Sequence, residues 1–428
     1  MSASSTAASP SVPWWKEPTK DQWYAYTAAW LGWTLDAFDF TIFFFILKPV
    51  AAEFNVPLTA VAFIATFTLW MRLLGATAAG WLGDRIGRRA PLMISILWYS
   101  ICNFIAGFSP TIMFLAVFRI LLGIGMGAEW PAGAALAMES WPARSRGFMS
   151  GVLQGSWGLG YALAAAANWA LYDIAGWRGL LWIGILPALA VVWIRFYVKE
   201  PEVWAENKRI QTQKKTEVTL PLLMIFKRKY LWNTLTGCAW MASAFCVYYS
   251  IWALFPTYLQ SLKWSGAEQF IPIFFANLIV FGGNALWGLV ADKWGRRPAI
   301  YIPAVIGILV TPIYLHTNDV TVVMAGFILQ GLFLGAIYGQ NPSYLCERFP
   351  TEVRATATGF VYHQGAIFGG LIPPMLSYFA NEQGMGYAMP MMISTTVFAV
   401  LVVIFVLLGP ETKGKEMSAE LEVFQPAE

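Results

Sequence analysis

Long apolar runs, each bounded by charged residues, proline or glycine, follow one another along almost the whole chain. Most of them are long enough to cross a ~30 Å apolar layer as a helix with a rise of ~1.5 Å per residue. The predicted spans are residues 24–49, 57–83, 90–109, 111–138, 147–172, 178–198, 231–259, 268–291, 299–316, 320–345, 355–380 and 387–408. The pattern predicts an all-α membrane protein with twelve transmembrane helices, six on each side of a polar stretch.

The low content of charged residues argues against a soluble protein. Only 12% of the 428 residues are charged, whereas a soluble domain carries about 25%. The chain is 58% hydrophobic and contains 22 Trp and 30 Phe, and aromatic residues favour the membrane interface. A net charge of +4 gives no indication of a nucleic-acid partner.

The cysteines show no spacing typical of a metal site. All four lie inside or at the edge of apolar runs, and we interpret them as small core residues. They are Cys102, Cys238, Cys246 and Cys346. Neither a bound metal nor a cofactor is expected.

One short motif occurs twice, between spans two and three and between spans eight and nine. Its copies are Gly80-Trp-Leu-Gly-Asp-Arg-Ile-Gly-Arg-Arg89 and Gly288-Leu-Val-Ala-Asp-Lys-Trp-Gly-Arg-Arg297. A weaker echo keeps the same offset and relates Glu139, Pro142, Arg146 and Gly151 to Glu347, Pro350, Arg354 and Gly359. The chain is therefore predicted to consist of two related halves. Its expected parts are a tail (1–23), a first six-helix bundle (24–198), a linker (199–230), a second bundle (231–408) and a tail (409–428).

The distribution of Lys and Arg predicts the orientation of the chain. Basic residues gather in the even-numbered connections, including the two motif loops and the linker, and are scarce in the odd-numbered ones. Because basic loops stay in the cytoplasm, both termini are expected there. The expected location is the cell inner membrane.

The repeated loop resembles the signature loop of the major facilitator superfamily. Arg119-x-x-x-Gly123-x-Gly125-x-Gly127 and Pro410-Glu-Thr-Lys-Gly414 are similar to two further motifs of that family. The opening, with Pro13-Trp-Trp15, Gln22-Trp23 and residues 29–40 (AWLGWTLDAFDF), resembles sialic-acid:proton symporters, a group that includes lactate and pyruvate permeases. The chain lacks the extra spans that the best-known sialic acid carriers have between their halves. The resemblance implies two pseudo-symmetric six-helix bundles that move a small organic anion together with protons.

A few charged residues lie within the predicted spans. Such a charge costs ~2.5–3.5 kcal/mol on insertion scales and marks function by default. Asp36 and Asp39 are three residues apart, so they share a face of span one. The resemblance implies that Asp39 pairs with Arg119, because related sugar:proton symporters pair an acidic residue in span one with this arginine. Asp36 is the second candidate for proton coupling.

An anionic substrate needs a fixed positive partner. The planar fork of an arginine holds a carboxylate through two hydrogen bonds; Arg72 in span two is the first candidate and Arg119 the second. The second half could supply polar contacts from Tyr248, Tyr249, Gln340, Asn341, His363 and Gln364. A structural alternative stays open, in which Asp36, Arg72 and Glu129 form buried pairs that fix helix packing. Glu129 lies nearer the cytoplasmic end, which favours a structural role.

The repeated loops are interpreted as a gate latch that forms when the cytoplasmic side closes. Aspartates can cap helix ends, and the arginines can pair across the loops. The candidate latch residues are Gly80, Asp84, Arg85, Gly87, Arg88, Arg89, Glu139, Arg146, Asp292, Gly295, Arg296, Arg297, Glu347 and Arg354. Orientation by charge alone is the alternative. The glycines at 123, 125 and 127 follow no strand, so they indicate close helix contact rather than a phosphate loop.

The sequence thus predicts a carrier, not an enzyme. The expected function is proton-coupled symport of a lactate-type monocarboxylate or of sialic acid by alternating access. Transport of another small carboxylate or an aromatic acid is the alternative, followed by a membrane sensor or a channel. The expected partners are the anion, protons and the lipid bilayer, with no nucleic acid, and the expected state is a monomer.

Overall fold

The computed structural model describes residues 13–264 and 266–423. The helices of the first half are α1 (Lys20–Glu53), α2 (Leu58–Ile86), α3 (Arg89–Ala106), α4 (Ile112–Ser140), α5 (Arg146–Trp182) and α6 (Ala188–Tyr197). The linker contains α7 (Glu202–Lys214) and α8 (Pro221–Met224). The second half contains α9 (Arg228–Ile251), α10 (Phe255–Ser261), α11 (Gly266–Trp294), α12 (Pro298–Leu315), α13 (Val320–Leu332), α14 (Asn341–Glu347), α15 (Arg354–His363), α16 (Gly365–Asn381) and α17 (Ala388–Leu408).

Each predicted span is occupied by helix, but several spans are interrupted. Span ten consists of α13, the 3₁₀ helix η4 (Leu334–Tyr338) and α14, and span eleven consists of α15 and α16. Spans five and six are joined by a sharp turn at Gly176, whose non-helical φ of 61° suits glycine, so the range of α5 contains two helices that meet there. Within the part of the chain that the structure describes, nine helical stretches are long and apolar enough to cross a membrane. One of these, Ala143–Tyr197, holds two predicted spans, while α1 and the broken span eleven are not among the nine.

Several helices begin at residues suited to cap them. The Thr19 hydroxyl accepts a hydrogen bond from the Gln22 amide, and the Gln22 side chain accepts one from the Thr19 amide, which forms a capping box for α1. The Thr111 and Asp319 side chains cap α4 and α13 in the same position.

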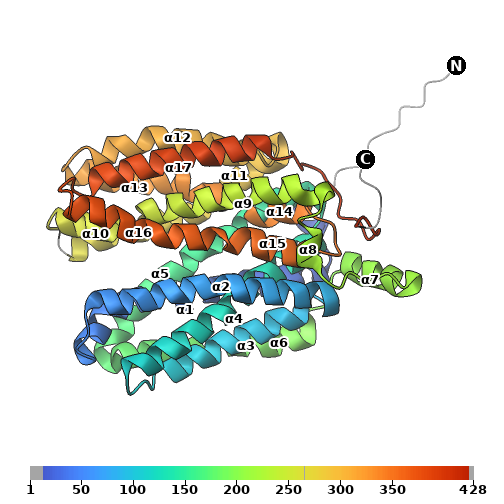
Figure 1. The fold of residues 1–428 in the computed structure, drawn as a ribbon, viewed down its shortest axis with the longest axis horizontal. Helices are drawn as coiled ribbons and strands as arrows, with labels where there is room; N and C mark the ends of the chain where they lie inside the picture. The colour runs from blue at the N-terminus through green and yellow to red at the C-terminus, as the bar shows by residue number, and fades with distance from the viewer. Residues whose placement is uncertain (1–12, 265, 424–428) are drawn as a thin grey trace.

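The two halves form two bundles that lie against each other (Figure 1). Helices α5 and α11 pack along each other across the seam between the halves, as do α2 and α15. Both motif loops, the linker helices and the ends of the described chain lie at one end of the bundles, on the right in Figure 1. We call it the motif end and the other end the opposite end.

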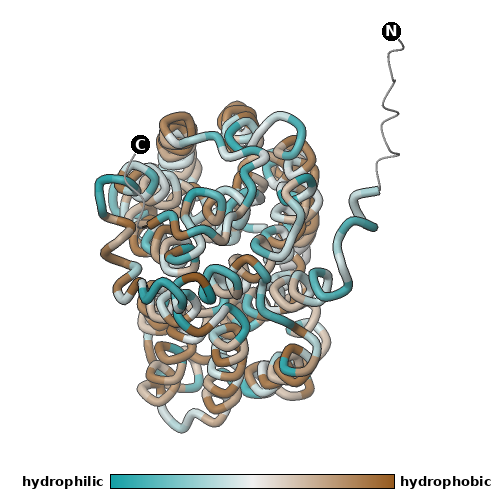
Figure 2. Tube along the Cα trace, turned by 90° about the vertical axis from the view of Figure 1, so that its right-hand side faces the viewer, coloured by the Kyte–Doolittle hydropathy of each residue, from teal (hydrophilic) through white to brown (hydrophobic). Residues whose placement is uncertain are grey.

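The outer surface of the bundles is apolar. Large side chains such as Trp169 (84% exposed), Ile174 (81%) and Phe196 (76%) face outwards. Viewed from the motif end, hydrophobic segments lie around the outside of both bundles and hydrophilic ones gather on the connections (Figure 2). Contiguous exposed apolar surface on this scale suits lipid and not water.

Glycines allow α2 and α4 to touch backbone to backbone. A Cβ atom added to Gly123 would lie 2.1 Å from the Thr68 carbonyl oxygen, and one added to Gly127 would lie 2.0 Å from that of Arg72. This agrees with the prediction that the glycine run serves close helix contact. The contact holds Arg72 of α2 against α4 in the middle of the first half.

Candidate functional site

Two cavities lie between the halves and share part of their walls. The smaller has a volume of about 70 Å³ and is lined by Trp33, Phe40, Leu69, Arg72, Gln154, Trp157, Phe245, Tyr248, Tyr249, Trp252, Asn277, Val280, Asn284, Gly335, Tyr338 and Tyr362. The larger has a volume of about 510 Å³, and its lining includes Lys48, Pro256 and Gln260 near the opposite end. The residues that line both are Phe40, Tyr248, Tyr249, Trp252 and Asn277. We call them the central cavity and the outer cavity.

Arg72 is the charged side chain that lines the central cavity. Its Nη2 atom lies 2.5 Å from Oδ2 of Asp36, and both residues are buried. The guanidinium also lies over the rings of Phe40 and Trp157, 5.0 and 5.5 Å from their centroids. Within the described chain, Nε of Arg72 and Oδ1 of Asp36 have no hydrogen-bond partner. The pair therefore keeps one donor and one acceptor atom that a ligand or a proton can use.

Asp39 and Arg119 do not form the direct ion pair that the resemblance implies. Instead, the amide of Asn103 on α3 lies between them: Nδ2 donates to Oδ1 of Asp39 at 3.0 Å, and Oδ1 accepts from Arg119 at 3.2 Å. The Arg119 guanidinium lies over Phe43, 4.1 Å from the ring centroid. Neither Asp39 nor Arg119 lines the two cavities. The bridge couples α1, α3 and α4 beside the cavities.

Of the six polar residues of the second half that were predicted to contact the substrate, two line the cavities and four do not. Tyr248 and Tyr249 line both cavities. The other four are buried outside the cavity walls. Gln340 donates to the Gly147 carbonyl and Gln364 to the Cys238 and Val361 carbonyls, while Nδ1 of His363 lies 3.1 Å from the Gly359 carbonyl. Asn341 has no side-chain partner among the described residues.

At the motif end, Asp84 of the first half caps a helix of the second half. Its carboxylate accepts hydrogen bonds from the amides of Ala355 and Thr356, at 3.0 and 2.9 Å, and from the Thr356 hydroxyl at 2.7 Å. These amides belong to the first turn of α15, where helical N–H groups have no partner within the helix. Gly80 allows the approach, because a Cβ atom there would lie 2.6 Å from the Ala355 carbonyl oxygen.

A chain of charges supports this contact. Arg88 binds Asp84 at 2.9 Å and Glu139 at 2.7 Å, and Arg354 of the second half binds the same Glu139 at 2.6 Å. Burial lowers the pKa of Arg88, but the charges of Glu139 and Asp84 outweigh it and give a net increase. Arg88 therefore stays charged, and two arginines from different halves share one carboxylate.

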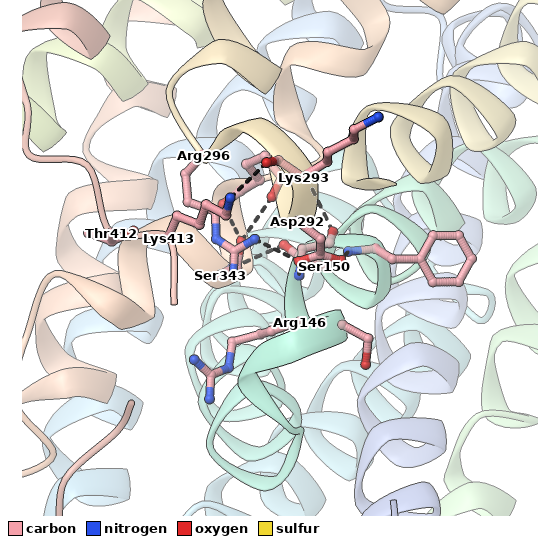
Figure 3. A network of polar contacts seen from close by, with 12 residues as sticks. Arg146, Ser150, Asp292, Lys293, Arg296, Ser343, Thr412 and Lys413 are labelled. Carbon is pink, nitrogen blue, oxygen red and sulfur yellow. Dashed lines mark hydrogen bonds and ion pairs between the residues drawn. The ribbon is translucent and has the colours of Figure 1, made fainter. Parts of the chain in front are cut away.

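The second half repeats the arrangement in the reverse direction. Asp292 accepts hydrogen bonds at 2.8 Å from the amides of Gly147 and Phe148 in the first turn of α5. Arg296 binds Asp292 at 2.9 Å and Glu347 at 2.8 Å. Figure 3 shows this network between the two halves. Arg146 of the first half completes it with a 3.3 Å contact to Glu347.

Two glutamates outside the motif loops hold the backbone of these loops through hydrogen bonds. Glu200 accepts hydrogen bonds from the amides of Arg88 and Arg89, and Glu411 accepts them from those of Arg296 and Arg297. Both loops turn at a glycine with positive φ, Gly87 (111°) and Gly295 (120°), where a side chain would also collide with the glutamate. The candidate set of latch residues omitted Glu200 and Glu411, although Glu411 belongs to the Pro-Glu-Thr-Lys-Gly motif.

The remaining motif arginines lie around the latch. Arg89 donates to the Val198 and Arg195 carbonyls, and Arg297 donates to the Leu407 carbonyl. Arg85 is half exposed and reaches Glu217 only at 4.0 Å. These contacts tie the loops to neighbouring helix ends of the same half or to the linker.

A family model described as the Major Facilitator Superfamily matches residues 29–285 and 278–424. The chain belongs to this superfamily. It is a multi-pass membrane transporter, not an enzyme. Its two bundles are the two halves that the superfamily fold predicts, and the repeated loops occupy corresponding places in each.

Relatives match over nearly the full length. The probable 4-methylmuconolactone transporter of Cupriavidus pinatubonensis (strain JMP 134 / LMG 1197) is 29% identical over 97% of this chain and 97% of its own. The sialic acid transporter NanX of Escherichia coli (strain K12) is 28% identical over 95% of this chain and 98% of its own. The solved structure of the proton:xylose symporter XylE bound to 6-bromo-6-deoxy-D-glucose has a TM-score of 0.74 at 19% identity, over 92% of this chain and 97% of that one.

This superfamily member is closed at the motif end. Both latches are formed there, and the outer cavity leads from the central cavity towards the opposite end. The stacked rings of Trp130 and Tyr362, whose centroids are 4.0 Å apart, join the two halves between the central cavity and the latches. Opening of the motif end therefore requires the latches and this stack to break.

Several residues of the site were missed by the sequence analysis. Asn103 is the most informative, because a single amide within the apolar run of α3 is a recognisable signal. Side-chain amides from α5 and α11 and further aromatic rings also line the central cavity, and the composition of the chain could not predict which of them would do so. These residues are Gln154, Asn277, Asn284, Trp157, Phe245, Tyr338 and Tyr362.

Proposed function

We propose that the chain is a proton-coupled symporter that carries a small organic acid anion through the central cavity by alternating access. The observation that carries this proposal is the position of Arg72, a buried guanidinium on the cavity wall with a carboxylate partner of its own. A substrate carboxylate can take the Nε donor that Asp36 leaves free and can also compete with Asp36 for the guanidinium.

This competition suggests how the proton is coupled. When the anion takes the guanidinium, Asp36 loses its positive partner in a buried site. A buried, unpaired carboxylate is strongly disfavoured, so a proton binds to it. The anion and the proton are then loaded together, so that the cavity gains no net charge. Asp39, bridged to Arg119 through Asn103, is a second proton site next to this one.

The walls of the central cavity favour an anion with a flat apolar body. Rings from both halves surround Arg72, while the amides are few. Such walls stack well on a planar unsaturated or aromatic acid, but they leave most hydroxyl groups of a sugar acid without partners. The relative named as a probable 4-methylmuconolactone transporter supports this substrate class, and NanX supports sialic acid. Of the substrates expected from the sequence, the alternative of another small carboxylate or an aromatic acid fits better than lactate or sialic acid.

The sidedness follows from the basic loops. The motif end is the cytoplasmic end in the inner membrane, so that the closed latches face the cytoplasm and the outer cavity faces outwards. One chain contains both halves of the seam and the whole central cavity, which suits a monomer.

Uptake into proteoliposomes tests the proposal. The purified protein is given labelled 4-methylmuconolactone, sialic acid or lactate, with and without an inward proton gradient. We expect gradient-driven, saturable uptake of the first and its loss in Arg72→Gln and Asp39→Asn. Arg178→Gln is the control, since Arg178 pairs with Glu53 at the opposite end, away from the central cavity. Undiminished uptake in Asp39→Asn removes that residue from coupling, and uptake that ignores the gradient in the unchanged protein refutes symport.

A sensor or a channel is the alternative function. Saturation of the rate at low substrate concentration separates a carrier from a channel. A protein that binds the acids without moving them would be a sensor.

A further inference from the structure

Glu129 on α4 is a buried carboxylate that the mechanism above does not use. It is 1% exposed, and neither of its carboxylate oxygens has a hydrogen-bond partner within residues 13–264 and 266–423. The buried pairing considered for it from the sequence is absent from this part of the chain. A charged carboxylate without a partner in such a place is strongly disfavoured, whereas a neutral carboxylic acid is tolerated.

Glu129 lies about one turn of α1 closer to the motif end than the Asp36–Arg72 pair. Its Oε1 atom is 2.5 Å from the position that a Cβ atom on Gly32 would take. Gly32 and Asp36 are four residues apart on α1, so they are neighbours on one face of that helix. Along α4, Glu129 is midway between Arg119, beside the cavities, and Glu139, in the latch.

The groups around Glu129 come from four helices. Asp36 on α1 and Arg72 on α2 are the charged groups that act on it. The Tyr99 hydroxyl on α3, which has no hydrogen-bond partner among the described residues, lies within electrostatic reach of these two groups and of Glu129. From α15, His363 lies 6.1 Å from the ring of Trp130, the residue next to Glu129. Among the described side chains, none forms a hydrogen bond or ion pair with Glu129, and Arg72, the cation that acts on it, is paired with Asp36.

Trp130, the residue next to Glu129, belongs to a contact between the two halves that separates Glu129 from the motif end and that we call the seal. Trp130 stacks on Tyr362 of the second half, its Nε1 donates to Oε1 of Gln154, and Nε2 of Gln154 donates to the Tyr362 hydroxyl. Gln154 and Tyr362 also line the central cavity. Because this seal spans both halves, opening the motif end removes it and admits water beside Glu129.

We propose that Glu129 is a proton-binding site on the release side of the transport path. In the state closed at the motif end it is a neutral carboxylic acid. When the seal opens, it gives its proton to water, which leaves a carboxylate and a hydronium ion at the motif end. After closure the carboxylate takes a proton from the cavity side. This inference rests on the proposed proton-coupled transport and adds a site that is loaded and emptied in each cycle.

Infrared spectroscopy of the purified protein tests the protonation state without any substrate. At neutral pH, the carbonyl stretch of a buried protonated carboxyl is expected in the unchanged protein and is expected to be lost in Glu129→Gln. Glu53→Gln is the matched control, because Glu53 is a partly exposed carboxylate paired with Arg178, and it should leave the band unchanged. A band of equal size in Glu129→Gln overturns the proposal, whether or not the protein transports anything.

Transport tests the release role in the same variants. The probe is labelled 4-methylmuconolactone, and if that acid is not taken up, whichever of sialic acid and lactate the unchanged protein accumulates. With a gradient of one pH unit, loss of one coupled proton should lower accumulation about tenfold. Exchange of labelled for unlabelled substrate moves no net proton, so it should persist in Glu129→Gln and shows that the variant is folded. Full accumulation in Glu129→Gln overturns the proposal, whereas no gradient-driven uptake in the unchanged protein overturns the proposed symport instead.

Discussion

Asp84 and Thr356 join the two halves at the motif end through two hydrogen bonds, from the Thr356 amide at 2.9 Å and from its hydroxyl at 2.7 Å. Asp292 repeats the relationship with Phe148 at 2.8 Å. Each aspartate therefore acts as a helix cap that belongs to the other half of the protein. Because both contacts span the two halves, we expect them to form only while the motif end is closed and so to bias the populations of open and closed states.

We expect Asp84→Asn to favour opening of the motif end. The amide keeps one acceptor but loses the charge that suits a helix N-terminus, and loss of a cap costs about 0.5–2 kcal/mol. Cys346 is fully buried beside the latch, so its rate of labelling by a maleimide reports opening. The rate should rise in Asp84→Asn. Asp319→Asn is the control, because Asp319 caps α13 within its own half; equal labelling rates in both variants would contradict the prediction.

Asn103→Leu should separate proton coupling from substrate binding. The substitution removes the amide that bridges Asp39 and Arg119 but leaves the walls of the central cavity unchanged. Substrate affinity should stay near that of the unchanged protein, while the pH dependence of uptake shifts, because Asp39 loses a donor that stabilises its charged form. Binding by fluorescence and uptake across a pH series are the measurements. A lower affinity with an unchanged pH profile would assign Asn103 to the substrate instead.

Gly127→Ala should destabilise the protein and slow transport. The added Cβ atom would lie 2.0 Å from the Arg72 carbonyl oxygen, so α2 must move and carry Arg72 with it. Overpacking of this kind costs about 1–3 kcal/mol, which a thermal unfolding series in detergent can detect. At Gly282 nothing lies within 4 Å of an added Cβ atom. Gly282→Ala is therefore the control and should be neutral or stabilising.

Glu200 should make stability depend on pH. Burial raises its pKa above the ordinary value of 4.5, and the hydrogen bonds from Arg88 and Arg89 offset this only in part. An acid whose folded pKa is raised stabilises the folded state at low pH, and this contribution is lost as pH rises through the folded pKa. The melting temperature of Glu200→Gln should therefore fall less between acid and neutral pH than that of the unchanged protein.

The control for Glu200 is an exposed glutamate with the opposite shift. A hydrogen bond from Arg209 lowers the pKa of Glu206, and both side chains are solvent-exposed. Glu206→Gln should change the pH profile little, because exposed pairs contribute little to stability. Identical profiles for Glu200→Gln and the unchanged protein would show that Glu200 has the same proton affinity in both folded and unfolded states.

The sequence by itself determined that this is a two-half, twelve-span membrane protein. Apolar runs must be long enough to cross lipid, and the spacing of the two motif copies reveals the repeat, so both properties are visible in one dimension. Gly123 and Gly127 could also be assigned to helix contact, because a small residue every four positions faces a neighbouring helix.

Only the tertiary structure decided which charged residues meet. Asp39 and Arg119 are implied to pair, yet Asn103 of a third helix lies between them, while Asp36 binds Arg72. His363 and Gln364 lie outside the cavity walls, and Tyr362 lies in them, because these positions depend on the break between α15 and α16 and on the rotation of each helix. A helix face covers about a third of its residues, and sequence periodicity shows which residues share a face but not which partner the face meets across the seam.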